Sequence, residues 1–500
     1  MRLRVFGAVL VSSVLLVGTG QAVAAPERGA GSIAWQPCAE AQAIECGFLE
    51  LPVDHARPKG EKFPLAVSRR RASDPSRRIG AMIINPGGPG GSGVEFSFAA
   101  EGVFSKEITD RFDVIGFDPR GVARSAPIRC SADVLARQPS LYPKSRAEFD
   151  AVVAYNRELR ADCRKNTGAL FDHVSTTDVA HDIDAIRRAL GEKKINYFGV
   201  SYGTFMGQQY AELYGRNVRA MVQDSVVDHS LGTWRFIETL SRGVAGVFDE
   251  WVKWSDRTPS SPFHGRDLRA VWRGLLAKAD RGELKDAQGD VVTAEALGAL
   301  VQGTGYLPEW QWLAEHTAAL EQGDPVQAGA FAKTELVEFP AVAVFCDDWN
   351  LRIRSWGEYQ AVHAMDVRLS PDTRGNALGH TFLVACAGLP KASNPQRPLT
   401  IKNAPKILMT NSRYDPATVY EWAVNAHRQT RDTTVFVTYE GWGHVVYERS
   451  ECTRKINDDY LLSLKLPHDG TRCAAVEPIV SAKTTNRPWL SDHGLIRIPT

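Results

Sequence analysis

INYFGVSYGT, residues 195–204, joins a short apolar run to a segment with helical character. Its centre is Gly199-Val200-Ser201-Tyr202-Gly203, a G-x-S-x-G pattern. Two interpretations are open. The glycines let a strand and a helix pack closely, or the tight turn between them exposes the Ser201 hydroxyl for chemistry. The pattern is short enough to arise by chance, so the surrounding sequence has to decide between them.

Further apolar runs on both sides of this stretch predict strands, each bounded by turn residues. Most are continuous rather than alternating, which is typical of a sheet buried on both faces. Helical periodicity lies between them, as in residues 177–190, so we expect a mostly parallel, doubly wound α/β sheet. The predicted strands are residues 79–85, 112–118, 195–200, 218–227, 406–410 and 434–439.

No strands are predicted between about residues 232 and 402, where eight of the twelve tryptophans lie. This block predicts a helical cap inserted into the sheet domain. The expected organisation is a leader (1–24), a first core part (25–231), the cap (232–402) and a second core part (403–500).

Charge and composition exclude several classes of partner. A net charge of +1 over 500 residues gives no sign of binding to nucleic acid or to a membrane surface. The basic run at residues 68–78, SRRRASDPSRR, is interpreted as a solvated connection between strands.

The N-terminus resembles a secretory leader, with Arg2 and Arg4, an apolar stretch over residues 5–17 and a small-x-small site at residues 22–24. The stretch is too short for a membrane span, and no cysteine follows it that would carry a lipid anchor. We therefore expect a secreted protein that begins at Ala25.

Export predicts that the eight cysteines are oxidised. Eight cysteines allow 105 pairings. The simplest is sequential, Cys38–Cys46, Cys130–Cys163, Cys346–Cys386 and Cys452–Cys473. The absence of C-x-x-C argues against cysteine-based zinc or redox chemistry.

Three other segments follow predicted strands and carry groups that a serine nucleophile needs. The glycine-rich loop at residues 85–93, NPGGPGGSG, lacks the lysine of a phosphate-binding loop but offers backbone N–H groups for an oxyanion. Asp415 and His444 follow the strands at 406–410 and 434–439, in the order Ser, Asp, His. All four segments end where open α/β sheets gather catalytic groups.

Together these motifs resemble the α/β-hydrolase peptidases of the proline iminopeptidase type, and especially the secreted tripeptidyl aminopeptidases of actinomycetes. The resemblance runs from about residue 35 to residue 473. It implies Ser201 as nucleophile, Asp415 as orienting acid and His444 as base. It also implies that Gly88, or its neighbour Gly87, and Tyr202 supply the oxyanion N–H groups. The motifs are CGFLELPVDH (46–55), NPGGPGGSG (85–93), FDPRGVARS (117–125), GVSYGT (199–204), TNSRYDPAT (410–418) and GWGH (441–444).

The chain departs from the family at Gln208-Gln209, Asp224-Ser225 and Asp228-His229, and these differences bear on substrate preference. Relatives that are aminopeptidases hold the substrate's ammonium with an acidic group, for which Asp347 and Asp348 are the candidates. A solvated acidic pair is the alternative interpretation of these two residues.

The expected function is therefore a secreted serine exopeptidase that releases short N-terminal peptides, with tripeptides the favoured product, and that needs no metal or cofactor. A secreted esterase or a proline iminopeptidase-like aminopeptidase of the same fold is the alternative. A non-catalytic binding protein is the third reading, and the filled triad positions argue against it.

Overall fold

The computed structural model describes residues 31–286, 289–323 and 336–478. The leader predicted for residues 1–24 lies outside this range. None of the helices in the described residues combines the length and apolarity that a membrane crossing requires.

A ten-stranded sheet forms the centre of the molecule, in the order β1-β2-β3-β5-β4-β7-β8-β10-β11-β12. From β5 to β12 neighbouring strands are parallel, whereas β1, β2, β3 and β5 pair antiparallel. The strands are β1 (Gln36–Pro37), β2 (Glu45–Pro52), β3 (Lys62–Arg70), β4 (Gly80–Asn85), β5 (Phe112–Phe117), β7 (Ile195–Val200), β8 (Val218–Asp224), β10 (Ile407–Tyr414), β11 (Thr434–Trp442) and β12 (Thr471–Cys473). A separate two-stranded sheet pairs β6 (Arg129–Ser131) with β9 (Leu336–Glu338).

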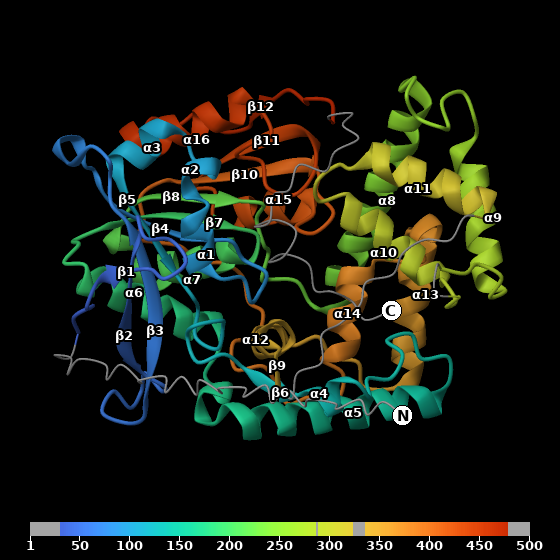
Figure 1. The fold of residues 1–500 in the computed structure, drawn as a ribbon, viewed down its shortest axis with the longest axis horizontal. Coiled ribbons are helices and arrows are strands. Elements are labelled where there is room, and N and C mark those ends of the chain that lie inside the picture. The colour runs from blue at the N-terminus through green and yellow to red at the C-terminus, as the bar shows by residue number, and fades with distance from the viewer. Residues whose placement is uncertain (1–30, 287–288, 324–335, 479–500) are drawn as a thin grey trace, which may run out of the picture.

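Helices cover both faces of the sheet (Figure 1). The helices of the described residues are α1 (Gly93–Phe98), α2 (Ala100–Val103), α3 (Lys106–Arg111), α4 (Ala132–Leu135), α5 (Arg146–Thr167), α6 (Thr176–Ala189), α7 (Tyr202–Tyr214), α8 (Thr233–Arg257), α9 (Leu268–Asp280), α10 (Ala294–Thr304), α11 (Trp310–Gln322), α12 (Pro340–Asp348), α13 (Trp356–Leu369), α14 (Ala377–Ala385), α15 (Tyr420–Gln429) and α16 (Glu451–Ser463). Short 3-10 turns complete the set, namely η1 (Pro75–Arg77), η2 (Ala169–Asp172), η3 (Gly215–Asn217) and η4 (Pro371–Thr373).

The strands are buried on both faces because successive residues enter different cores. In β4, Ile83 packs with residues of α6 and α7, while its neighbours Met82 and Ile84 pack with residues of α1, α3 and α16. This two-sided burial explains the continuous apolar runs and confirms the doubly wound α/β prediction.

All six predicted strands are present as β4, β5, β7, β8, β10 and β11, with three notable differences in length, one of which is the continuation of β11 from residue 439 to Trp442. The strand predicted to reach residue 227 ends at Asp224, because Ser225 adopts a left-handed φ of 65°. β10 continues beyond residue 410 to Tyr414.

The antiparallel strands at the N-terminal edge escaped the sequence analysis. In β2, buried Leu49 and Leu51 flank exposed Glu50, so the apolar signal alternates. The basic run at 68–78 begins within β3 rather than after it, which corrects its interpretation as a connection only. Two of its arginines, Arg69 and Arg71, pair with Glu45 of β2.

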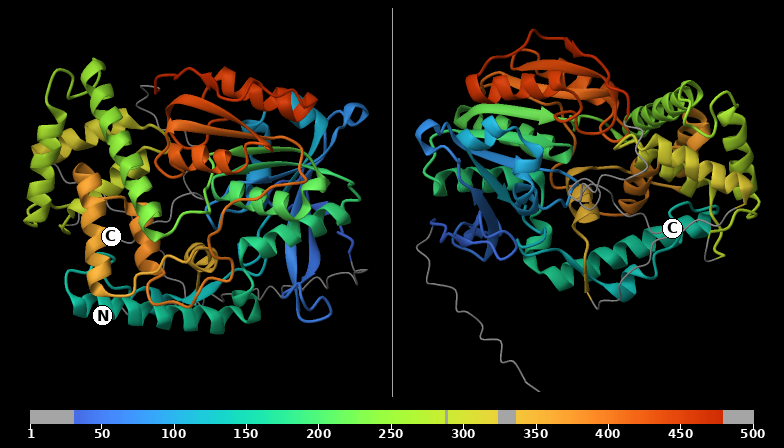
Figure 2. Two further views of the ribbon diagram at one scale, coloured as in Figure 1. Left: turned by 180° about the vertical axis from the view of Figure 1, so that it is seen from behind. Right: turned by 45° about the horizontal axis from the view of Figure 1, so that its top comes forward.

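Helices α8 to α14 all lie between β8 and β10 in sequence and stand beside the sheet in Figures 1 and 2. Tryptophans 251, 254, 272 and 310 share one buried cluster in this part. Helix α5, which comes from between β5 and β7, joins it. The Asn156 side chain of α5 donates to the carbonyls of Val384 and Ala387, at 2.8 and 3.0 Å. Two separate segments of the chain therefore build the helical part, and the boundaries at 232 and 402 stay a prediction.

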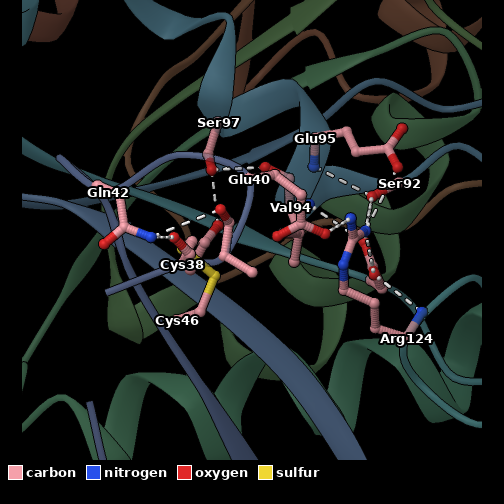
Figure 3. Close-up of a disulfide and its surroundings, with 12 residues drawn as sticks. Cys38, Glu40, Gln42, Cys46, Ser92, Val94, Glu95, Ser97 and Arg124 are labelled. Atoms are coloured by element: carbon pink, nitrogen blue, oxygen red, sulfur yellow. Dashed lines mark hydrogen bonds and ion pairs between the residues drawn. A yellow bond between two sulfur atoms is a disulfide. The ribbon is translucent and has the colours of Figure 1, made fainter. Parts of the chain in front are cut away.

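The four disulfides are Cys38–Cys46, Cys130–Cys163, Cys346–Cys386 and Cys452–Cys473, as sequential pairing predicted. The first of them closes the loop between β1 and β2, where Glu40 pairs with Arg124 at 2.9 Å (Figure 3). Arg124 also reaches Glu95 of α1, the helix that follows the glycine-rich loop. The N-terminal hairpin is thereby fastened beside that loop.

Candidate active site

Ser201 occupies a sharp turn between β7 and α7, with φ 56° and ψ −125°. A non-glycine residue in this region is strained, and such strain is typical of functional turns. The Ser201 N–H donates to the Asp224 carbonyl at 2.9 Å, and the Ser201 carbonyl accepts from Thr204 Oγ1 at 2.7 Å. These bonds hold the backbone in its strained conformation.

The glycines on either side of Ser201 are required by close backbone contacts. A Cβ on Gly199 would collide with the carbonyl oxygen of Gly203, and a Cβ on Gly203 would lie 2.7 Å from the Asn85 carbonyl oxygen. The two interpretations of the glycines are therefore compatible, because the close approach of β7 and α7 creates the turn that exposes Ser201.

Asp415 and His444 form a buried pair at the ends of β10 and β11. The His444 Nδ1 atom lies 2.9 Å from Asp415 Oδ2 and 3.0 Å from Oδ1. The same carboxylate accepts from the N–H groups of Ala417 and Thr418 and from the Thr418 hydroxyl, which fixes its orientation. An ionised carboxylate only accepts, so Nδ1 carries the hydrogen and Nε2 is left with a lone pair.

The glycine-rich loop lies against the Ser201 turn. A Cβ on Gly87 would lie 2.7 Å from the Tyr202 nitrogen and 3.0 Å from Ser201 Cβ. The Gly87 N–H already donates to Asn85 Oδ1 at 2.8 Å, so of the two glycines Gly88 stays the predicted oxyanion donor. Tyr202 is the first residue of α7, and an N–H at that position has no acceptor within its helix.

The alpha/beta hydrolase fold family model matches residues 80–450, a range that includes every group described above. The chain belongs to the alpha/beta hydrolase family.

Curated relatives of this hydrolase cover nearly the whole chain. It is 33% identical to a tripeptidyl aminopeptidase of Streptomyces lividans, over 91% of this chain and 89% of the relative. It is 29% identical to the serine protease Hip1 of Mycobacterium tuberculosis, over 93% and 95%. A carboxylesterase B of the same organism is 28% identical over 95% and 99%. The hydrolase is therefore a serine hydrolase whose relatives include peptidases.

Asp224, at the end of β8, connects the serine turn of the hydrolase to its histidine loop. Its carbonyl accepts from Ser201, and its carboxylate accepts from the N–H groups of Val446 and Tyr447, each at 2.9 Å. The next residue, Ser225, accepts from the Val445 N–H at 2.9 Å. Burial raises the pKa of Asp224 to about 6.

From the sequence, Asp224-Ser225 was predicted only to be a departure from the family pattern. Its position directly after a buried strand was the available signal that it belongs to the site.

Asp348 is fully buried, and protein donors surround it. Its carboxylate accepts from the N–H and hydroxyl of Thr176, from Asn394 Nδ2 and, at 2.7 Å, from the Tyr202 hydroxyl. Burial raises its pKa to about 7. Protein donors therefore already bind this carboxylate, which supports the Tyr202 hydroxyl, and the role of Asp348 in holding a substrate ammonium stays a prediction.

Asp347, unlike Asp348, lines a pocket. Tyr155, Arg160 and Phe339 line the same pocket, and the buried Oδ2 of Asp347 has no hydrogen-bond partner among the described residues. Burial raises the pKa of Asp347 to about 6. The residues that line this pocket do not include the loops of Ser201, Asp415 or His444.

A loop between α10 and α11 covers the imidazole of His444, a contact that was not predicted from the sequence. The backbone N–H of His444 donates to the Tyr306 carbonyl at 2.9 Å, and the two side-chain rings meet edge to face with centroids 5.1 Å apart. Three residues further along this loop, half-buried Glu309 has no ion-pair partner within the described residues, and burial raises its pKa.

Proposed function

We propose that this hydrolase is a secreted exopeptidase that removes tripeptides from the free N-terminus of peptides. The catalytic part rests on the buried His444–Asp415 pair. Asp224 hydrogen-bonds both the strained Ser201 turn and the loop that follows His444. The likeness to a tripeptidyl aminopeptidase supports the tripeptide product. Four disulfides support export, since cysteines remain oxidised outside the cytoplasm.

In the proposed reaction, Ser201 Oγ attacks the carbonyl carbon of the scissile peptide bond. Nε2 of His444 takes the hydroxyl proton and then gives it to the leaving amine, while Asp415 stabilises the imidazolium. The N–H groups of Gly88 and Tyr202 stabilise the oxyanion. A water molecule, deprotonated by His444, then hydrolyses the acyl-enzyme and restores Ser201.

An exopeptidase of this type also needs an anionic group about one tripeptide away from Ser201. We propose Glu309 for this role, with Asp347 as the competing candidate. Tyr306 contacts His444, and the Glu309 N–H donates to the Thr304 carbonyl at 3.2 Å, so the same tight loop places Glu309 near the histidine. Glu309 is free of ion pairs among the described residues, as a group reserved for a substrate cation should be.

The catalytic assignment is tested by Ser201→Ala, with exposed Ser463→Ala as the matched control. We expect turnover of a tripeptidyl anilide to fall on the order of 10⁶-fold and labelling by a fluorophosphonate to disappear. The control should retain both. Turnover by Ser201→Ala at a rate near that of the control would refute the assignment.

Recognition of the free amine is tested separately, with tripeptidyl anilides that carry a free or an acetylated N-terminus. Acetylation should abolish cleavage by the wild type. Glu309→Gln should lower kcat/KM for the free substrate about 10- to 100-fold, because a hydrogen bond to a charged group contributes about 1.5–3 kcal/mol. If Asp347→Asn has this effect and Glu309→Gln does not, Asp347 is the ammonium site.

Esterase activity is the second candidate, and the likeness to a carboxylesterase B favours it. Ester and amide cleavage use the same serine, histidine and oxyanion groups. Simple esters hydrolysed faster than every unblocked peptide would favour this alternative.

A further inference from the structure

A cluster of two histidines and an aspartate lies in the helical part, apart from the candidate triad. His363 and Asp366 are three residues apart on α13, so they share one face of that helix, and His380 comes from α14. Each residue offers one ligand atom, and these atoms lie within 4.8 Å of one another.

The two imidazoles present unpaired nitrogens to this cluster. His380 is 1% exposed, and its Nε2 lies 2.9 Å from the Leu141 carbonyl oxygen. A carbonyl only accepts, so Nε2 carries the hydrogen and the neutral ring keeps a lone pair on Nδ1. That Nδ1 is buried without a hydrogen-bond partner among the described residues, and so is Nδ1 of His363.

Asp366, also 1% exposed, is oriented by donors on one side only. Its Oδ1 accepts from the Ser241 hydroxyl at 2.7 Å and from the backbone and side-chain nitrogens of Asn376 at 2.9 and 2.8 Å. Its Oδ2 lies 3.8 Å from His380 Nδ1, too far for a hydrogen bond. Gly375 permits this arrangement, since a Cβ there would lie 2.5 Å from Oδ2.

His380 Nδ1, an oxygen of Asp366 and a ring nitrogen of His363 therefore converge, and neither Nδ1 atom has a protein partner among the described residues. A metal ion satisfies all three at once. The surroundings match those of metal ligands, because a ligating histidine usually donates its second N–H to a carbonyl and a ligating carboxylate is itself hydrogen-bonded.

We propose that His363, Asp366 and His380 bind one zinc ion. Two imidazoles and a carboxylate suit zinc, whereas Ca²⁺ and Mg²⁺ prefer oxygen ligands alone. Around tetrahedral zinc, ligand atoms about 2.0–2.1 Å from the metal are separated by about 3.3 Å. The 3.8 Å between His380 and Asp366 has to close by about 0.5 Å, and the separations to His363, which are within 4.8 Å, have to close by at most about 1.5 Å. A water molecule completes the coordination.

The ion acts as a structural clamp. It joins α13 to α14 and, through the Leu141 carbonyl, to the segment before α5. Tyr142, next to Leu141, stacks on the His380 ring with centroids 4.2 Å apart and shields the site. Unlike a cysteine site, this one has no sequence signature, because its ligands come from two helices.

The test uses the full-length mature protein without a histidine tag, freed of metal by a chelator and then dialysed. We expect one Zn²⁺ per chain by mass spectrometry of metals after incubation with zinc chloride and removal of the excess. The bound ion should also raise the midpoint of thermal unfolding by several degrees.

His363 is half-buried, and His363→Gln should abolish both effects. The control is His316→Gln, which replaces a half-buried histidine of α11 that is not part of the cluster and should keep both effects. His380→Gln serves as a second variant, judged by metal content if it unfolds more easily. Absence of bound zinc in the wild type, or equal zinc binding by His363→Gln, would overturn the proposal. In that case the cluster only packs α13 against α14 and holds no ion.

Discussion

Replacing Ser201 by glycine should stabilise the fold while removing activity. Ser201 has φ 56° and ψ −125°, a conformation that glycine adopts freely and other residues adopt under strain. The strain costs about 1–3 kcal/mol, and glycine loses about 0.4–1 kcal/mol more backbone entropy on folding than alanine. Ser201→Gly should therefore unfold with a free energy about 1 kcal/mol above that of Ser201→Ala.

The comparison between the two variants isolates the backbone effect, since both lack the hydroxyl and both are expected to be inactive. Equilibrium urea unfolding at constant pH, followed by fluorescence, measures the difference. The matched control is Ala161→Gly at an exposed position inside α5, which should lose about 0.5–1 kcal/mol. The reasoning fails if Ser201→Gly is as stable as Ser201→Ala or less stable, because the turn would then hold no strain for glycine to relieve.

Two further predictions concern buried groups near the site. Ser225→Ala should lose about 1–3 kcal/mol, because it keeps φ 65° and leaves the Val445 N–H unpaired, and Ser225→Gly should lose less because it relieves the left-handed strain. Urea unfolding of both variants checks this order, and the opposite order would contradict it. Asp347→Asn should alter the dependence of stability on pH. Burial raises the pKa of Asp347 to about 6 from 3.8, so the folded state binds the proton more tightly than the unfolded state. The wild type then loses stability as pH rises from about 4 to 6, by about 1–3 kcal/mol through this group. Asp347→Asn should remove that part of the slope, and identical slopes for the two proteins would disprove it.

Much of the core could be predicted because its signals are local. Each of the six apolar runs is a buried strand, since both faces of a parallel sheet exclude polar residues. Sequential cysteine pairing was also right, because the paired residues lie in segments that are adjacent in the fold. The antiparallel β2 and β3 were missed, since a strand with one exposed face gives an alternating and weaker signal.

Part of the candidate site could be predicted, because each catalytic candidate directly follows a predicted strand. Ser201, Asp415 and His444 all end strands of one parallel sheet, and parallel strands bring their carboxyl ends to the same edge. The pairing of Asp415 with His444 was expected on this ground, and the two side chains lie 2.9 Å apart.

Other parts of the site depend on contacts between segments far apart in the sequence. The motif VFCDDWN gives no indication that Asp348 holds the Tyr202 hydroxyl while Asp347 lines a separate pocket. Nor does any local pattern show that Tyr306 covers His444, or that Asp224 connects the serine turn to the histidine loop.

The amino-acid sequence by itself determined the parallel sheet, the serine turn between its two glycines and the order of the catalytic candidates. These features follow from burial periodicity and from the small size of glycine, which act within a few residues. The tertiary structure alone decided which acidic groups are occupied by protein donors, which loop covers the histidine, and where His363, Asp366 and His380 converge. The physical reason is that a hydrogen bond or a metal site needs side chains that only folding brings together. The type of a residue does not show which distant residue it will contact.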